Sequence, residues 1–165
     1  RSTLSSSSAA SDVYKRQVKE RRSSNRHRHR VDYFIRTGTV VNHGFDSYFG
    51  IPYSNDMGRT ATANGKRVHP LMRDEKVAEL LEDEGQRRVT REYTKEAVKF
   101  IETNTKAEKN FFLYLPHTAM HVPLFPHPDF VGKSKNGTYG DWVEEVDWSV
   151  GQILKTLKEH FRSLQ

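Results

Sequence analysis

The chain has 165 residues, of which 35% are hydrophobic and 29% charged, so it is long enough for one domain, or part of one, with a modest core. Residues 1–30 hold nine Lys and Arg against two Asp and Glu, whereas the remaining residues hold 18 against 19. The net charge of +6 therefore belongs to the first 30 residues and does not indicate a nucleic-acid partner for the fold. The lack of cysteine excludes disulfides, thiolate metal sites and a cysteine nucleophile in this chain. No apolar run approaches the roughly 20 residues that a membrane span requires.

Residues 1–30 are rich in Ser and Arg and have no apolar periodicity, which predicts disorder. The first seventeen residues look like translated adapter sequence, and the chain begins with Arg instead of Met. We therefore interpret the leader as disordered or artefactual, and the chain as a fragment. The run Arg26 to Arg30 is interpreted as a solvated basic tail in preference to a metal or RNA patch.

After the leader, the string VDYFI predicts a short strand over residues 31–35. Residues 40–58 predict a turn-rich loop, because glycines and a proline forbid a helix there and four aromatic residues can anchor it: Phe45, Tyr48, Phe49 and Tyr53. Residues 59–89 are polar and highly charged. We expect only one or two short, poorly ordered turns over that segment.

Apolar residues spaced i, i+4, i+7 and i+8, with Thr90 as N-cap, predict a helix over residues 90–105. The uninterrupted run FFLYL over residues 111–115 predicts a strand buried on both faces. Residues 116–140 are rich in proline and glycine and predict a loop. The order helix, buried strand, loop, helix is typical of part of an open α/β sheet.

A second helix is predicted to open at Asp141. Its apolar residues recur at helical spacing and form one stripe, made of Val143, Val146, Val150, Ile153, Leu154 and Leu157. The acidic cluster of Glu144, Glu145 and Asp147 is predicted to lie on the solvated face of this helix.

His121 stands in the string HVPLF, shortly after the apolar run. Imidazole exchanges a proton near neutral pH, so His121 could donate to an anionic substrate or protonate a leaving group. The alternative is a histidine of a surface loop. His117 lies four residues earlier, but Pro116 and Pro123 exclude a helix, so this spacing does not indicate a zinc site.

Ser54 lies in the turn GIPYSND, where a hydroxyl and backbone N–H groups could face an anion, or where the serine could cap its own turn. Asn55 and Asp56 leave the same two interpretations open. The triplet from Asn136 to Thr138 fits an N-glycosylation acceptor in a surface loop, although such triplets also arise by chance. The sequence has no phosphate loop, no Gly-rich dinucleotide turn and no serine nucleophile elbow.

Five strings along the chain together resemble sulfatases of the arylsulfatase A and N-acetylgalactosamine-6-sulfatase type, in the order and spacing of that family. They cover about residues 40–159, and five consecutive blocks are more specific than any single motif. The strings are NHGFDSYFGIPYSNDMG, PLMRDEKV, YTKEAVKFIETN, FFLYLPHTAMHVPLF and GKSKNGTYGDWVEEVDWSVGQILKTL. Residues 31–165 are therefore interpreted as a fragment of a sulfatase catalytic domain.

The resemblance implies an α/β fold, namely a partial alkaline-phosphatase-like sandwich with a mixed sheet flanked by helices, truncated at both ends. It also implies hydrolysis of sulfate esters by a formylglycine nucleophile, which is made from the Cys or Ser of a C/S-x-P-x-R motif. A calcium ion held by Asp and Asn side chains would polarise the sulfate.

Two of the family's polar active-site positions match residues of this chain. His121 matches the histidine of the H-x-P loop, which implies a catalytic and substrate-binding role beside the sulfate and the leaving-group oxygen. Ser54 matches the serine of the IPYS turn, which implies a substrate-binding role. The chain contains no C/S-x-P-x-R, G-K-W-H-L-G or DNG string. We therefore expect Ca²⁺ in the full-length family enzyme and no metal ligand among the residues of this chain.

The sequence thus predicts an inactive fragment of a sulfuric ester hydrolase, whose full-length form acts on a sulfated glycan or an aryl sulfate. There are two alternatives. One is a non-catalytic protein, either a pseudo-enzyme or an anion- or glycan-binding module. The other is a different hydrolase of the alkaline-phosphatase superfamily, such as a phosphodiesterase. The lack of additional His and Asp metal ligands disfavours the phosphodiesterase. The resemblance implies a lysosomal, secreted or periplasmic location.

Overall fold

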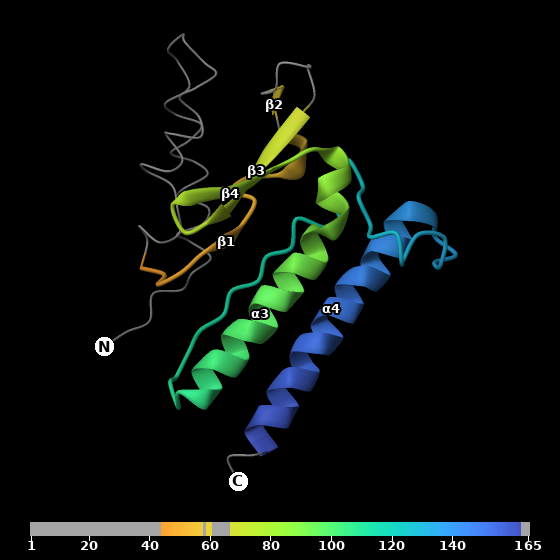
Figure 1. Ribbon diagram of the computed structural model, residues 1–165. Coiled ribbons are helices and arrows are strands. Elements are labelled where there is room, and N and C mark those ends of the chain that lie inside the picture. The colour runs from red at the N-terminus through yellow and green to blue at the C-terminus, as the bar shows by residue number, and fades with distance from the viewer. Residues whose placement is uncertain (1–43, 58, 61–66, 163–165) are drawn as a thin grey trace.

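The computed structural model describes residues 44–57, 59–60 and 67–162. The predicted leader and the predicted strand over residues 31–35 lie outside these ranges. A small antiparallel sheet stands above the end of a pair of long helices (Figure 1). The described elements, in chain order, are β1 (Phe49–Gly50), η2 (Asn55–Met57), β2 (Arg59–Thr60), β3 (Arg67–Arg73), β4 (Lys76–Leu81), η3 (Asp83–Arg88), α3 (Val89–Lys106) and α4 (Gly137–Arg162).

Strand β3 organises the sheet, because it pairs antiparallel with β1, β2 and β4. The expectation of poorly ordered turns over residues 59–89 is wrong here, since β3 and β4 form a hairpin. Its turn is short because Arg73 pairs with Lys76, and Asp74 adopts the left-handed conformation (φ 54°) that Asp tolerates better than most residues. Asp74 also ties the turn to the start of β1, since its carboxylate accepts the N–H of Tyr48 at 2.9 Å.

The buried side of this hairpin forms the core above the helices. The interior of β3, from Val68 to Met72, is buried, whereas the charged residues of β4 remain exposed. Residues from β1, the hairpin and α3 meet in one hydrophobic cluster: Ile51, Leu71, Leu81, Val89 and Tyr93. The first turns of α3 are thereby fixed against the sheet.

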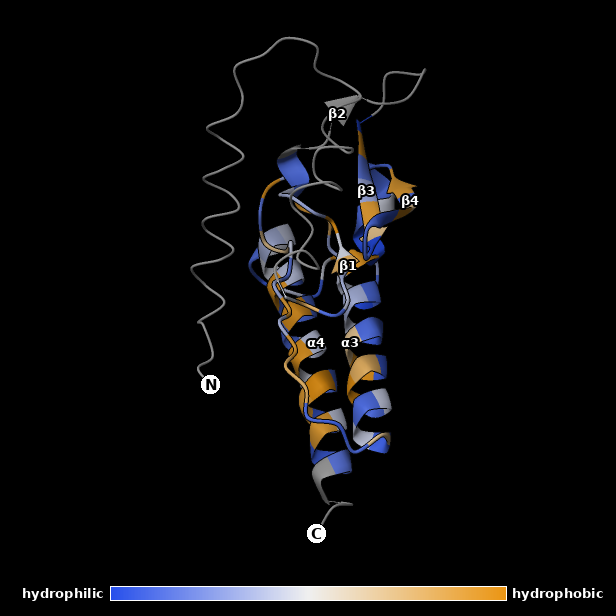
Figure 2. Ribbon diagram, turned by 90° about the vertical axis from the view of Figure 1, so that its left-hand side faces the viewer, coloured by the Kyte–Doolittle hydropathy of each residue, from blue (hydrophilic) through white to orange (hydrophobic). Residues whose placement is uncertain are grey.

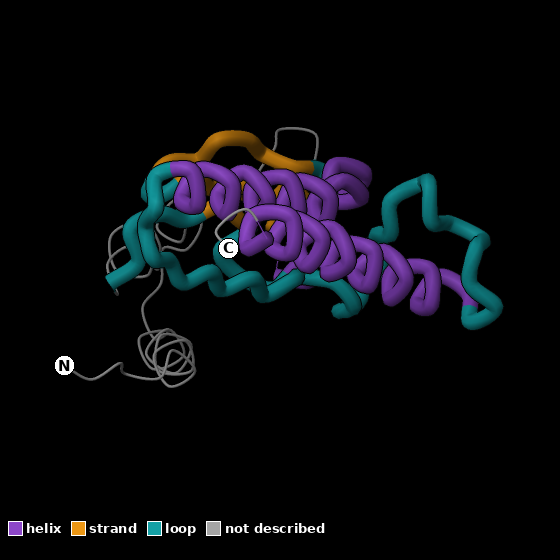
Figure 3. The backbone as a smooth tube through the Cα atoms, turned by 90° about the horizontal axis from the view of Figure 1, so that it is seen from below, coloured by secondary structure: helices purple, strands orange, loops and turns teal. Residues whose placement is uncertain are grey.

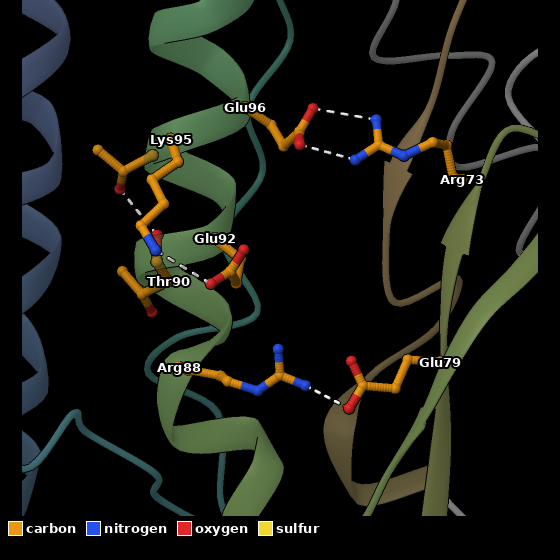
Figure 4. Close-up of polar contacts among 8 residues, drawn as sticks. Arg73, Glu79, Arg88, Thr90, Glu92, Lys95 and Glu96 are labelled. Atoms are coloured by element: carbon orange, nitrogen blue, oxygen red, sulfur yellow. Dashed lines mark hydrogen bonds and ion pairs between the residues drawn. The ribbon is translucent and has the colours of Figure 1, made fainter.

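Two ion pairs join the hairpin to the helical segment beside it, one to Glu96 of α3 and one to Arg88 at the end of η3 (Figure 4). The guanidinium of Arg73 donates to both carboxylate oxygens of Glu96, at 3.0 and 2.7 Å, and Arg88 pairs with Glu79 at 2.5 Å. Exposed pairs of this kind typically stabilise a fold by less than about 1 kcal/mol each, so they fix orientation more than stability.

The predicted helix over residues 90–105 is confirmed as α3, which extends by one residue at each end. Thr90 is not its N-cap, because η3 leads directly into the helix and Arg88 occupies that position. Thr90 instead lies buried in the first turn, where its hydroxyl accepts the indole N–H of Trp142 at 3.3 Å. This bond joins α3 to α4.

Helix α4 begins at Gly137, earlier than the predicted Asp141, and lies beside α3 (Figures 1 and 3). It faces α3 with a mixed and largely polar set of buried side chains at helical spacing: Trp142, Glu145, Ser149 and Thr156. The hydroxyls of Thr94 on α3 and Ser149 on α4 are 2.6 Å apart at the centre of this interface. Polar residues therefore carry the contact between the two helices.

Half of the predicted apolar stripe of α4 is exposed, whereas Val146, Ile153 and Leu157 are partly buried. Val143, Val150 and Leu154 have exposed fractions of 39%, 44% and 49%. Figure 2 shows these apolar colours along α4. These three residues lie on one side of α4 and leave an exposed apolar strip along it.

The expected buried strand over residues 111–115 is wrong in this structure. The segment is extended but unpaired, and Phe112 and Tyr114 are 64% and 49% exposed. It runs back beside α3, where the ring of Phe111 meets that of Phe100 edge-on at 5.5 Å (Figure 1). A strand covered on both faces needs neighbouring strands, and the described residues offer it none.

The exposed α4 stripe leads us to expect that the purified chain self-associates. Replacing two stripe residues, as Val150→Lys with Leu154→Lys, should lower the weight-average mass in light scattering, because charge opposes burial of this face. The pair Thr103→Lys and Asn110→Lys adds the same charge at exposed positions elsewhere. Equal loss of association in both double variants would contradict a role for the stripe.

Candidate functional site

A single buried amide joins the two loops that carry the predicted site residues. Asn55 is 1% exposed, and its Nδ2 donates to the backbone carbonyls of His121 at 3.2 Å and Pro123 at 2.9 Å. The two N–H groups of one amide suffice for both bonds. The turn after β1 and the loop after residue 115 are thus held side by side, although they are far apart in the sequence.

The turn that carries Ser54 is itself fixed to the core. The backbone N–H of Ile51 donates to the hydroxyl of Tyr93 on α3 at 2.9 Å, and both residues belong to the hydrophobic cluster. Burial raises the pKa of Tyr93 to about 12, so its hydroxyl stays protonated at physiological pH. A rigid helix therefore sets the position of this turn.

His121 is exposed, and its ring is oriented by a backbone contact. Its Nδ1 lies 2.6 Å from the carbonyl oxygen of Val122. Because a carbonyl oxygen can only accept, Nδ1 must carry the proton of this bond. Nε2 is then the nitrogen that remains to exchange a proton with a ligand. The prolines around His117 and His121 do exclude a helix, as expected, since residues 116–123 contain none.

Ser54 lies beside a carboxylate at the same turn. Its hydroxyl oxygen is buried and has no hydrogen-bond partner of good geometry among the described residues. The hydroxyl is nonetheless near enough to the Asp56 carboxylate to hold the pKa of Asp56 below its usual range, and the nearby His121 and Arg67 lower it further. The turn therefore brings a hydroxyl and an ionised carboxylate near the imidazole of His121, which lies on the other loop.

This arrangement supplies hydrogen-bonding groups but not a metal site. The described part of the chain contains no group of three or more His, Cys, Asp or Glu side chains that could bind a metal ion. Calcium takes six to eight oxygen ligands, and Asp56 brings a single carboxylate to the turn. The described residues therefore do not fit the calcium ion that the family resemblance implies.

His117 has a different environment from His121. It is partly buried between the helices, where its Nε2 lies 3.4 Å from the Ser149 hydroxyl and its ring 6.2 Å from that of Tyr93. Burial lowers its pKa and favours the neutral ring. The structure therefore separates an interface histidine, His117, from an exposed one, His121.

The sequence pattern did not indicate a role for His69. It lies in β3 with no exposed surface, and neither ring nitrogen has a hydrogen-bond partner among the described residues. Burial lowers its pKa, so the ring packs as a neutral group 6.2 Å from the ring of Tyr53, next to the Ser54 turn. The only available signal was its place within the mostly apolar run from Val68 to Met72.

Glu145 corrects the prediction of a wholly solvated acidic face on α4. Glu144 and Asp147 are exposed, but Glu145 has no exposed surface. Its Oε2 accepts the backbone N–H of His127 at 2.8 Å, whereas Oε1 has no partner among the described residues. Burial raises the pKa of Glu145 to about 7, although nearby Arg91 opposes this shift.

Glu145 is expected to contribute more stability as the pH falls from about 7 toward 4.5, whereas the buried His69 and the partly buried His117 contribute less. Its pKa is about 7 when folded and 4.5 when unfolded, so the folded state binds more protons within this window. At about 1.4 kcal/mol per pKa unit, the free energy of unfolding should change by at most about 3 kcal/mol. Urea denaturation at several pH values measures this effect.

Glu145→Gln should remove that pH dependence and raise stability at pH 7.5, since the amide cannot ionise. Glu144→Gln, at the neighbouring exposed position, is the matched control and should leave the dependence intact. A difference in stability between Glu145→Gln and the wild type that does not change between pH 7.5 and pH 5 would contradict this account of Glu145, because the comparison cancels the contributions of His69 and His117.

Comparison with known proteins assigns the family. The sequence pattern of the family described as Sulfatase matches residues 13–163, nearly the whole chain, and the chain therefore belongs to the sulfatase family. The match includes residues 13–30 of the predicted leader, so the boundary at residue 30 stays a prediction.

The chain is similar to several curated sulfatases. It is 52% identical to human steryl-sulfatase over 71 residues, which cover 43% of this chain and 12% of that protein. It is 37% identical to mouse N-acetylgalactosamine-6-sulfatase over 131 residues, which cover 72% of this chain and 24% of that protein. The chain thus spans no more than about a quarter of the length of these relatives.

A solved structure supports the same fold. This sulfatase comes from work on glycosaminoglycan metabolism by Bacteroides thetaiotaomicron, and it matches with a TM-score of 0.56 at 24% identity, over 75% of this chain and 35% of its own. The predicted class, a partial alkaline-phosphatase-like α/β fold, is confirmed. No described helix is long and apolar enough to span a membrane.

Proposed function

We propose that this chain forms one wall of the active site of a sulfate ester hydrolase. In this proposal His121 is catalytic, and Ser54 and His121 bind the sulfate group of a sulfated glycan or an aryl sulfate. The observation that carries it is the pair of hydrogen bonds from Asn55, which holds the Ser54 turn against the His121 loop. Membership of the sulfatase family supplies the reaction class.

The proposed roles follow from the protons that the two side chains can offer. Nδ1 of His121 is engaged by the Val122 carbonyl, so a protonated Nε2 would donate to the leaving-group oxygen as its bond to sulfur breaks. The Ser54 hydroxyl, which lies near the Asp56 carboxylate, would turn to donate to a sulfate oxygen instead. Such bonds to a charged group typically contribute about 1.5–3 kcal/mol each.

The nucleophile and the metal ion are assigned to the complete protein, outside this chain. The sequence contains no C/S-x-P-x-R motif from which formylglycine could be made. The described residues also lack a cluster that could bind calcium. The chain alone is therefore proposed to be inactive, and the complete protein is proposed to act in a lysosomal, secreted or periplasmic compartment.

A chimera tests these roles in an active context. The aligned segment of mouse N-acetylgalactosamine-6-sulfatase is replaced by the matching residues of this chain, which are 37% identical to it. We expect a folded chimera that hydrolyses a sulfate ester. His121→Gln within it should lower kcat about 10²–10⁴-fold through loss of general acid catalysis, and Ser54→Ala should lower kcat/KM about 10–100-fold.

His127→Gln in the same chimera is the matched control, because His127 follows the same loop but contacts Asp129 and Glu145. It should leave kcat within a few-fold of the parent chimera. A folded His121→Gln chimera with unchanged kcat would contradict the catalytic role. The isolated chain, assayed with calcium and an aryl sulfate, should match a heat-treated sample, and turnover above that level would contradict its inactivity.

A further inference from the structure

The one N-x-S/T triplet of the sequence, from Asn136 to Thr138, lies where the loop passes into α4, and its middle residue is glycine. All three residues are exposed. Neither the candidate anion site nor the helix interface uses them. The triplet is therefore accessible and takes no part in the candidate site or the helix interface.

A buried carboxylate holds the loop in shape. Asp141 is 2% exposed, and its two oxygens accept the backbone N–H groups of Gly132 at 2.9 Å and Ser134 at 2.8 Å. These bonds lower the pKa of Asp141, so it stays ionised and keeps its acceptors. Ser134 in turn accepts the backbone N–H of Asn136 at 3.1 Å through its hydroxyl. The backbone at Asn136 is thus anchored from within the loop.

The loop also packs closely against α4 at Gly140. A Cβ atom at Gly140 would lie 2.1 Å from the Ser134 hydroxyl oxygen and 2.8 Å from Cβ of Asn136, so no larger residue fits without a shift. Gly137, the middle residue of the triplet, has a φ of 64°, a conformation that favours glycine. The triplet therefore lies in a well-defined turn at the start of α4.

This turn stands at the outside of the molecule. Figure 3 shows the loop before α4 projecting beyond the two helices, at the end opposite to the C-terminus. The Asn136 side chain is exposed, and the loop bonds described above engage only its backbone. A bulky group attached to the Asn136 amide would extend into solvent, without displacing any contact that holds the loop.

We propose that Asn136 is a site of N-linked glycosylation. The donor is an oligosaccharide carried on a polyprenyl pyrophosphate. The amide nitrogen Nδ2 of Asn136 forms a bond to the anomeric carbon of the first sugar as the bond from that carbon to the pyrophosphate oxygen breaks. Nδ2 loses one proton, and the lipid pyrophosphate leaves. The Thr138 hydroxyl is the part of the acceptor that the transferase recognises.

The test expresses the full chain behind a cleavable signal peptide in a eukaryotic secretory system. A C-terminal tag with one efficient acceptor triplet reports translocation in every variant. The variants are Asn136→Gln, which removes the acceptor nitrogen, Thr138→Ala, which removes the hydroxyl, and Thr138→Ser, which keeps it. Gel mobility before and after treatment with peptide-N-glycosidase counts the glycans, and peptide mass spectrometry locates them.

The parent chain and Thr138→Ser should carry two glycans, one on the tag and one on Asn136. Asn136→Gln and Thr138→Ala should carry only the tag glycan. A parent chain that is glycosylated on its tag alone would overturn the proposal, as would a second glycan that persists in Asn136→Gln. Because transfer occurs on the translocating chain, this result does not depend on whether the chain hydrolyses sulfate esters.

Discussion

The side-chain amide of Asn55 is the constraint on which the candidate site depends. It is buried, it donates to two carbonyl groups of one loop, and it belongs to the turn that carries Ser54. Each of these partly buried hydrogen bonds contributes about 0.5–1.5 kcal/mol, so the amide favours the joined arrangement of the loops. The hydrogen bond from Ile51 to Tyr93 holds this turn against α3, so α3 indirectly sets the position of His121.

The two helices are held together in a different way, because hydrogen-bonding groups form much of the contact between α3 and α4. Thr94 and Ser149 meet at the centre, with His117 beside them, and Glu145 is buried further along α4. This arrangement makes the contact specific, but it leaves an ionisable group in the interface. It also leaves Val143, Val150 and Leu154 of the α4 stripe exposed, on a helix that its sequence predicts to be amphipathic.

The sequence predicted the features whose determinants are local. The periodicity that begins near Thr90 gives α3 to within one residue, and the strings around Ser54 and His121 indicate the family. Features that depend on distant partners were missed. The run 111–115 has the composition of a central strand but no strands beside it. Strand β3 instead carries Pro70 in its interior and lies within the highly charged segment 59–89, so it did not resemble a strand. The sequence did not decide the role of Asn55, because only the folded chain brings its side-chain amide to residues 121–123.

Hydrogen exchange measures the central claim directly, because opening of the loop should follow loss of the Asn55 amide. In Asn55→Ala, the amides of residues 118–125 should exchange about 10–100-fold faster, as expected for about 1.4–2.8 kcal/mol of lost local stability. Asn104→Ala, which removes a comparable amide-to-carbonyl bond to Phe100 near the end of α3, should leave this segment unchanged. Unchanged exchange over residues 118–125 in Asn55→Ala would contradict the account.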